Sequence, residues 1–147
     1  ERKVDREDHA PPKDPISGKG VILIIDDEPL ILDSTKDLLE MLGYTVYCAA
    51  SGQEGTAFYM EKKDRIDLVV LDMILPGMSG SQVLKMLKAN NPGVKVILSS
   101  GYSLQGEVQK VMDDGCIGFI EKPFNLTELS TIIHQALHPA DGKAGEA

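Results

Sequence analysis

Short aliphatic runs alternate with stretches of helical periodicity along this chain, and this order limits the possible folds more than any other feature. Five runs are strand-like, at residues 21–25, 45–49, 68–71, 94–98 and 117–120. Five stretches space their apolar residues as helices do, at 29–42, 53–63, 82–90, 104–114 and 126–138. Strands buried on both faces have continuous apolar sequences, and parallel strands need helical crossovers. The alternation therefore predicts an α/β fold with a parallel sheet covered by helices on both faces.

Residues that begin and end helices stand at the expected boundaries. Gly43 follows the first helical stretch, where a left-handed C-cap is expected. Three pairs can cap helix starts, namely Ser51 with Glu54, Ser79 with Gln82 and Asn125 with Glu128. These signals support the assignment of the intervening stretches as helices.

Composition and charge indicate one acidic domain between two polar ends. The chain has 147 residues, a usual size for one domain, and a formal net charge of −8. Residues 1–20 and 139–147 lack apolar periodicity, which predicts a flexible linker and a flexible tail around a domain at 21–138. Acidic charge without a basic stripe argues against nucleic-acid binding or direct membrane contact.

The apolar stretches and the cysteines favour a cytoplasmic location. No apolar stretch approaches the ~20 residues needed to span a bilayer, and the charged N-terminus is unlike a signal peptide. Cys48 and Cys116 lie far apart in apolar surroundings. We expect both to be reduced core residues, with a disulfide as the less favoured alternative.

Polar side chains follow four of the strand-like runs. Asp26 and Asp27 follow the first run, Asp72 the third, Ser100 the fourth and Lys122 the fifth. Ligands of open parallel sheets bind at the carboxyl ends of the strands. Two or three carboxylates suit Mg²⁺, while a lysine and a hydroxyl can contact the oxygens of a phosphoryl group. Solvated turn residues would explain Asp26 and Asp27 alone, but the whole set favours a site in which one carboxylate is the nucleophile.

Four motifs resemble those of the receiver domain of two-component response regulators. They are "IIDDEP" (24–29), "VVLDMILPGMSG" (69–80), "ILSSGYS" (97–103) and "FIEKPF" (119–124), and each lies at the end of a predicted strand. Their combination is far more specific than any one of them, and the resemblance covers roughly residues 20–138. It implies a doubly wound, flavodoxin-like sheet with strand order 2-1-3-4-5.

The resemblance also implies the roles of the residues in the site. Asp72 matches the phosphoacceptor, and Lys122 matches the lysine that pairs with the phosphoryl group. The implied cofactor is Mg²⁺, held by Asp26, Asp27, Asp72 and the backbone carbonyl of Ile74.

Further matching positions concern the conformational switch and the lifetime of the phosphoaspartate. Ser100 matches the switch hydroxyl, and it is assigned in preference to Ser99 because Gly101 follows it. Phe119 matches the aromatic switch position, although it is equally well explained as an ordinary core residue. Ile74 and Tyr102 stand two residues after the acceptor and the switch hydroxyl, where the family tunes hydrolysis. Neither side chain holds a water as a carboxylate or amide would, so we expect slow hydrolysis.

The implied function is that of a phosphoacceptor signalling domain in a phosphorelay, without turnover of an external substrate. A histidine kinase or a histidine phosphotransfer domain would be the partner, and the helices at 104–114 and 126–138 with the strand at 117–120 would form the responding surface, which could also support a homodimer. The wording "ILSSGYS" resembles receivers fused to hybrid histidine kinases, and no DNA-binding domain is expected to follow. A stand-alone response regulator is the alternative.

Other classes of function fit the residues less well. A Mg²⁺-dependent phosphohydrolase would need a further acid or base near Asp72, where Met73 and Ile74 stand instead. A flavin-binding domain would need a phosphate loop after the first strand, where the sequence is acidic. His134 and His138 have the spacing of helical metal ligands but no evident third ligand, and a solvated helix end explains them.

Overall fold

The aliphatic runs form one five-stranded parallel sheet in the computed structural model, which describes residues 14–102 and 105–139. The strands are β1 (Val21–Ile25), β2 (Thr45–Ala49), β3 (Leu68–Asp72), β4 (Val96–Ser100) and β5 (Gly118–Glu121). Their order across the sheet is β2-β1-β3-β4-β5, and each pair of neighbours is parallel. The predicted fold class and strand order are confirmed.

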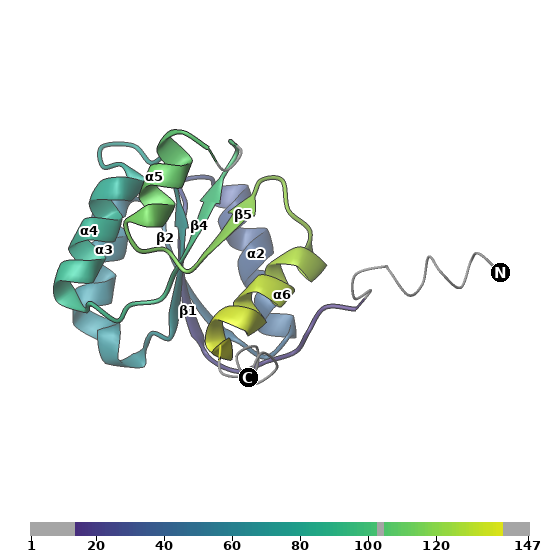
Figure 1. The fold of residues 1–147 in the computed structure, drawn as a ribbon. Coiled ribbons are helices and arrows are strands. Elements are labelled where there is room, and N and C mark those ends of the chain that lie inside the picture. Colours follow the sequence, from purple (N-terminus) through teal and green to yellow (C-terminus); the bar gives the residue numbers. More distant parts are fainter. Residues whose placement is uncertain (1–13, 103–104, 140–147) are drawn as a thin grey trace.

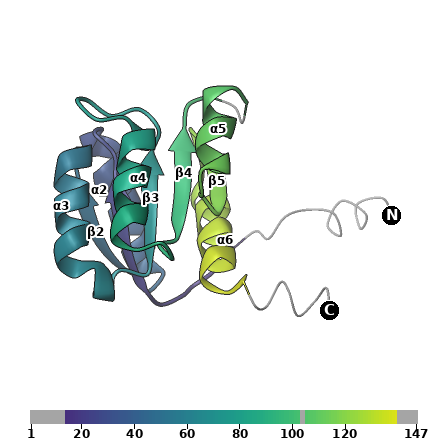
Figure 2. The same cartoon turned by 60° about the vertical axis from the view of Figure 1, so that its left-hand side comes forward.

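Helices cover both faces of this sheet. They are α2 (Pro29–Met41), α3 (Gly52–Lys62), α4 (Gly80–Asn90), α5 (Glu107–Asp113) and α6 (Leu126–Leu137), with a short 3-10 turn η1 (Lys63–Arg65) after α3. Helices α3, α4 and α5 lie on one face, while α2 and α6 lie on the other (Figures 1 and 2). None of the helices in the described part of the chain is long and apolar enough to cross a bilayer.

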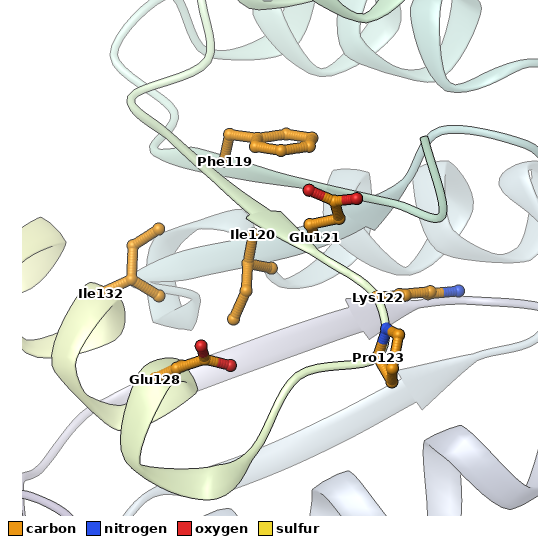
Figure 3. A pocket seen from close by; sticks show the side chains of 7 residues that line it. All are labelled: Phe119, Ile120, Glu121, Lys122, Pro123, Glu128 and Ile132. Atoms are coloured by element: carbon orange, nitrogen blue, oxygen red, sulfur yellow. The ribbon is translucent and has the colours of Figure 1, made fainter. Parts of the chain in front are cut away.

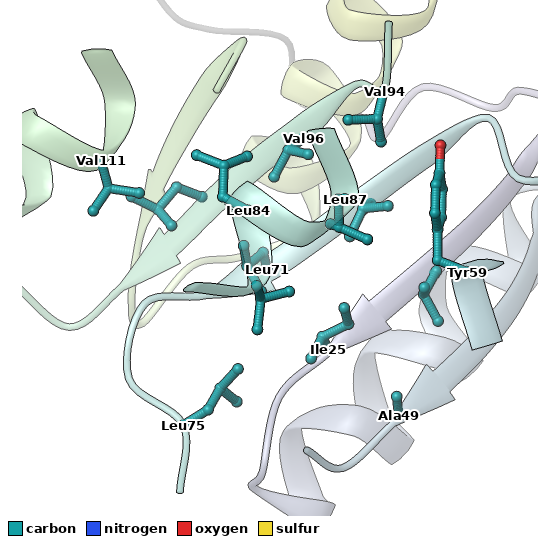
Figure 4. Close-up of a cluster of buried hydrophobic side chains, with 14 of the residues drawn as sticks. Ile25, Ala49, Tyr59, Leu71, Leu75, Leu84, Leu87, Val94, Val96 and Val111 are labelled. Carbon is teal, nitrogen blue, oxygen red and sulfur yellow. The ribbon is translucent and has the colours of Figure 1, made fainter. Parts of the chain in front are cut away.

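Successive residues of each strand alternate between two hydrophobic clusters, which is why the strand sequences are apolar without interruption. In β1, Leu23 and Ile25 join the cluster under α3, α4 and α5 (Figure 4), whereas Ile22 and Ile24 join the cluster under α2 and α6. All four side chains are buried. The two clusters hold the sheet from both sides and leave its carboxyl edge open for polar residues.

Three strands end later than the sequence predicted. β4 spans Val96–Ser100 rather than 94–98. It begins later because the turn at Asn91 continues through a hydrogen bond from the Val94 amide to the Asn91 carbonyl. β3 and β5 each extend one residue further, to Asp72 and Glu121. Asp72 and Ser100 therefore lie within the hydrogen-bonded ladder, which fixes their backbones, whereas Asp26, Asp27 and Lys122 follow their strands as predicted. The predicted start of a helix at Leu104 lies outside the described residues.

The predicted helix caps are present with one difference. Ser79 with Gln82 and Asn125 with Glu128 form complete capping boxes. Ser51 Oγ accepts a hydrogen bond from the Glu54 amide, but the Glu54 carboxylate accepts from the amide of Ala50 instead of Ser51. Gly43 has φ 112°, as the left-handed cap after α2 requires.

Part of the stretch predicted as a linker lies against the domain. The Ile16 amide donates to Ser130 Oγ on α6 at 3.1 Å, and the Gly18 amide donates to the Leu42 carbonyl at 2.9 Å. Sequence periodicity does not reveal such a segment, because its backbone rather than an apolar face makes these contacts. The remainder of the predicted linker, at 1–13, and most of the predicted tail, at 140–147, lie outside the described residues.

The first residue of α4 packs against the backbone that carries the end of β3. A Cβ atom at Gly80 would lie 2.8 Å from the Met73 carbonyl oxygen and 2.9 Å from the Asp72 carbonyl oxygen. The Gly80 amide also donates to the Met73 carbonyl at 2.9 Å. Glycine is therefore needed here for close approach, and this contact positions the Asp72 loop.

We expect Gly80→Ala to destabilise the protein by roughly 1–2 kcal/mol. Overpacking against backbone costs about 1–3 kcal/mol, and the better helix propensity of alanine returns at most about 1 kcal/mol. Urea unfolding would measure the loss. Gly93→Ala is the matched control, since its Cβ would meet only Asn91 Oδ1, at 3.5 Å. Equal stabilities of the two variants would contradict the steric argument.

Candidate functional site

Carboxylates from two neighbouring strands meet at the carboxyl edge of the sheet. Asp26 and Asp27 directly follow β1, and Asp72 is the last residue of β3. One carboxylate oxygen of each residue lies within 4.8 Å of the other two. Asp26 and Asp72 are buried, whereas Asp27 is exposed. The sheet thus brings the three predicted acidic residues together.

The Lys122 ammonium lies among carboxylates at the same edge. Its Nζ is 2.8 Å from Asp26 Oδ2, 3.4 Å from Asp72 Oδ2 and 3.4 Å from Glu28 Oε1. The Lys122 amide extends the β4–β5 ladder by donating to the Ser100 carbonyl at 2.7 Å. The peptide bond from Lys122 to Pro123 is cis. This lysine supplies positive charge beside two buried carboxylates.

The electrostatics of the site depend on burial and on this single cation. The pKa of Asp72 is raised to about 6, because the increase from burial and from the negative charge of Asp26 outweighs the decrease from Lys122 and from a backbone hydrogen bond from Ile74. Burial would lower the pKa of Lys122, but its hydrogen bond with Asp26 and the charge of Asp72 raise it above the usual value. Asp72 is therefore costly to ionise, while Lys122 stays protonated.

The two serines at the end of β4 have different surroundings. Both are buried. Ser100 Oγ accepts a hydrogen bond from the Tyr102 amide at 2.9 Å. Ser99 Oγ is also buried, but it has no hydrogen-bond partner among the described residues. Ser99 is the residue of β4 that pairs with Asp72, and Ser100 pairs with Glu121.

The remaining predicted residues surround this edge. The side chains of Ile74 and Tyr102 are exposed, at 57% and 63%. Tyr102 also lines a hollow of about 370 Å³ with Met73 and Val108. Phe119 is half-buried and packs against the cluster under α3, α4 and α5. Their positions allow the predicted roles without testing them.

A second hollow of about 460 Å³ lies between β5 and α6. Figure 3 shows the residues that line it, which are Phe119, Ile120, Glu121, Lys122, Pro123, Glu128 and Ile132. The Phe119 ring and the Ile120 side chain lie on opposite sides of β5 (Figure 3). Lys122 is shared by this hollow and the carboxylate site.

Sequence reasoning missed the contact between Glu28 and Lys122. Glu28 directly follows Asp26 and Asp27 and directly precedes α2, and no pattern in the sequence pairs it with Lys122. The rings of His134 and His138 lie 4.4 Å apart on α6. Within the described ranges, the group of three residues that could hold a metal ion is Asp26, Asp27 and Asp72.

Known proteins of similar sequence include both a large sensor kinase and a small phosphotransferase. "Sensor kinase CckA" of Brucella abortus is 33% identical over 126 residues, which are 86% of this chain and 13% of that protein. "Sporulation initiation phosphotransferase F" of Bacillus subtilis is 32% identical over 116 residues, which are 79% of this chain and 92% of that protein.

Known structures agree in fold. A response regulator receiver domain protein from Clostridium thermocellum is 34% identical, with a TM-score of 0.78 over 83% of this chain and 97% of that one. The receiver domain of the sensor histidine kinase PA1611 from Pseudomonas aeruginosa is 25% identical, with a TM-score of 0.73 over 82% of this chain and 98% of that one, and its structure contains a magnesium ion in the active-site cleft.

The family comparison agrees with the fold and with the residues at the carboxyl edge of the sheet. The response regulator receiver domain matches residues 22–134, which include β1 from its second residue, the other four strands and the whole carboxylate site. The protein therefore belongs to the response regulator receiver domain family, whose members act in two-component phosphorelays.

Proposed function

We propose that this domain accepts a phosphoryl group from a phosphohistidine onto Asp72 and changes conformation in response. The observation that carries the proposal is the placement of Asp72. Its buried carboxylate ends β3, lies 3.4 Å from the Lys122 ammonium and belongs to the carboxylate group with Asp26 and Asp27. Membership of the receiver family supports the same assignment.

The proposed reaction is an in-line displacement at phosphorus. A bond forms between an Asp72 carboxylate oxygen and phosphorus while the bond from phosphorus to the imidazole nitrogen breaks. The imidazole keeps the electron pair and takes up a proton. Negative charge on the phosphoryl oxygens is stabilised by fixed positive charge, and Lys122 supplies such a charge beside Asp72. The pairing with Lys122 also favours the ionised, nucleophilic form of Asp72.

The donor set at the edge of the sheet suits Mg²⁺. Three carboxylates within reach of one another offer hard oxygen ligands, and two of them are buried with Lys122 as their cation. We propose that Asp26, Asp27, Asp72 and the Ile74 carbonyl hold the ion. Bound Mg²⁺ would neutralise charge on phosphoryl oxygens. The magnesium in the PA1611 receiver supports this choice of metal.

The proposed partner is a histidine kinase or a histidine phosphotransfer domain in the cytoplasm. The similarity to CckA supports a hybrid histidine kinase as the parent protein, and the similarity to the sporulation phosphotransferase supports the alternative of a stand-alone regulator. In either context the domain acts as a phosphoacceptor that modifies itself rather than as a turnover enzyme. The gene sequence upstream of Glu1 would distinguish the two.

Ser100 and Phe119 are the proposed link from the site to the surface. Ser100 Oγ would turn toward the phosphoryl group, and Phe119 would change its packing on β5. The responding surface would comprise α5, β5 and α6, and it is also the proposed surface for a homodimer. The position of Ser100 at the end of β4, with its side chain bonded to the following loop, supports this role.

Asp72→Asn should abolish phosphorylation, because an amide nitrogen or oxygen is a far weaker nucleophile than the carboxylate. With Mg²⁺ and acetyl phosphate, wild type should gain the mass of one phosphoryl group, and the adduct should be labile to hydroxylamine. Intact-mass spectrometry measures both. Asp33→Asn, an exposed carboxylate on α2, is the control and should be labelled as wild type is. Full labelling of Asp72→Asn would disprove the assignment.

Asp72 should make the metal-free protein less stable as pH rises from about 4 to about 6. Its pKa is about 6 in the folded state against an ordinary 3.8, so the folded state binds more protons in this window and higher pH favours unfolding. Asp72→Asn should therefore be more stable than wild type above about pH 6, by at most about 3 kcal/mol.

Urea unfolding of both proteins in a chelator, at several pH values, tests this expectation. The difference in unfolding free energy between them should grow across the window and then level off, and Mg²⁺ should reduce it by stabilising wild type. A difference that stays constant with pH would show that Asp72 is not destabilised by burial.

The phosphoaspartate should hydrolyse slowly, over many minutes or longer. Ile74 and Tyr102 stand two residues after Asp72 and Ser100 with exposed side chains, and neither has a carboxylate or amide that would orient a water for attack on phosphorus. Ile74→Asn with Tyr102→Glu should accelerate hydrolysis about tenfold, equivalent to about 1.4 kcal/mol of barrier. Loss of the phosphoryl mass with time measures the rate. A wild-type lifetime of seconds, or no acceleration in the double variant, would rule out the shielding role.

A further inference from the structure

Glu28 is the third carboxylate in contact with Lys122, and it differs from the other two. Its Oε1 lies 3.4 Å from Lys122 Nζ, the same distance as Asp72 Oδ2. Asp26 and Asp72 belong to the carboxylate group that could hold a metal ion, and Glu28 does not. Among the described ion pairs of Lys122, the pair with Glu28 is thus the one that does not involve a carboxylate of that group.

The backbone around Glu28 directs this side chain to Lys122 rather than to the helix. Glu28 occupies the N-cap position of α2, where a side chain normally accepts a hydrogen bond from the first turn. Its side chain makes no such bond. The main chain is fixed by a hydrogen bond from the Glu28 amide to Asp26 Oδ1, at 3.0 Å, and by one from the Leu32 amide to the Glu28 carbonyl. The carboxylate is therefore available to Lys122.

We propose that Glu28 is a positioning residue that holds the Lys122 ammonium and competes for it with the phosphoryl group. This proposal rests on the proposed phosphorylation of Asp72. When a divalent cation engages Asp26 and Asp72, Glu28 keeps Lys122 at the mouth of the site. As charge develops on the phosphoryl oxygens, Lys122 turns toward them and leaves Glu28. An interaction present before the reaction and lost in the transition state slows the reaction.

The exposure of Glu28 limits the size of this effect. Its side chain is 58% exposed, against 14% for Lys122, so water and salt screen the pair. Exposed ion pairs are weak, and a few-fold change in rate is the expected scale. Glu28 therefore adjusts the reaction, whereas Asp72 and Lys122 make it possible.

Phosphorylation rates with acetyl phosphate and Mg²⁺ provide the first test. Glu28→Gln keeps the shape of the side chain, removes its charge and should accelerate phosphorylation roughly two- to five-fold. Glu121→Gln is the matched control, because Glu121 is adjacent to Lys122 in sequence and its side chain leaves β5 in another direction (Figure 3). The control should keep the wild-type rate. An unchanged rate in Glu28→Gln would overturn the proposal.

A double-mutant cycle separates competition for Lys122 from simple repulsion of an anionic donor. Lys122→Ala should react slowly but measurably, and adding Glu28→Gln to it should change nothing further. The same acceleration in both backgrounds would mean that Glu28 only repels the donor, and the proposal would be wrong.

The Lys122 ammonium itself gives a readout that does not depend on activity. In the Mg²⁺-loaded, unphosphorylated protein, nitrogen-15 NMR should detect faster exchange of the Lys122 ammonium protons in Glu28→Gln but not in Glu121→Gln. Equal exchange in all three proteins would overturn the positioning role. If wild type takes up no phosphoryl group at all, the proposed function fails, while this measurement still decides whether Glu28 holds Lys122.

Discussion

The ion pairs of Lys122 with Asp26 and Asp72 are the interaction on which the carboxyl edge of the sheet depends. Two buried carboxylates side by side are costly unless a cation compensates them. Lys122 follows β5, whereas Asp72 ends β3 and Asp26 follows β1, so the pair with Asp72 crosses β4 and the pair with Asp26 crosses β3 and β4. The positive charge of Lys122 that the proposed reaction needs is thus also the charge that compensates the two carboxylates at these strand ends.

Stability and reactivity conflict at this edge. The pKa of Asp72 is raised to about 6 by burial and by the negative charge of Asp26, and Lys122 only partly offsets this increase. A carboxylate that is costly to ionise gains from any added positive charge, which makes the edge receptive to a divalent cation. The protein tolerates this cost because hydrophobic clusters support the sheet on both faces. Conflict of this kind is expected where a fold serves chemistry.

The sequence predicted the sheet because each strand carries its own apolar signal, and it failed where a hydrogen bond or an ion pair, rather than apolar patterning, decides the structure. The run 21–25 needed no partner to be recognised, since both of its faces are apolar. Val94 is equally apolar and buried, yet it belongs to a turn, so hydrophobicity alone does not distinguish a strand residue from a buried turn residue. Ile16 is held to α6 through its amide, which no side-chain pattern records. Motif order found Lys122, but only packing placed Glu28 against it.

In the proposed switch, the contacts of Ser100 would determine where a signal from the site travels. Its carbonyl accepts the Lys122 amide and its hydroxyl accepts the Tyr102 amide, so one residue joins the ladder to β5 and the loop after β4. Rotation of the side chain would break the contact with Tyr102 and leave the ladder intact, because the carbonyl does not move with χ1. Sheets are rigid while loops rearrange at low cost. A turn of the Ser100 hydroxyl would therefore act first on the loop that leads into α5, and the sheet would serve as the fixed frame against which that loop moves.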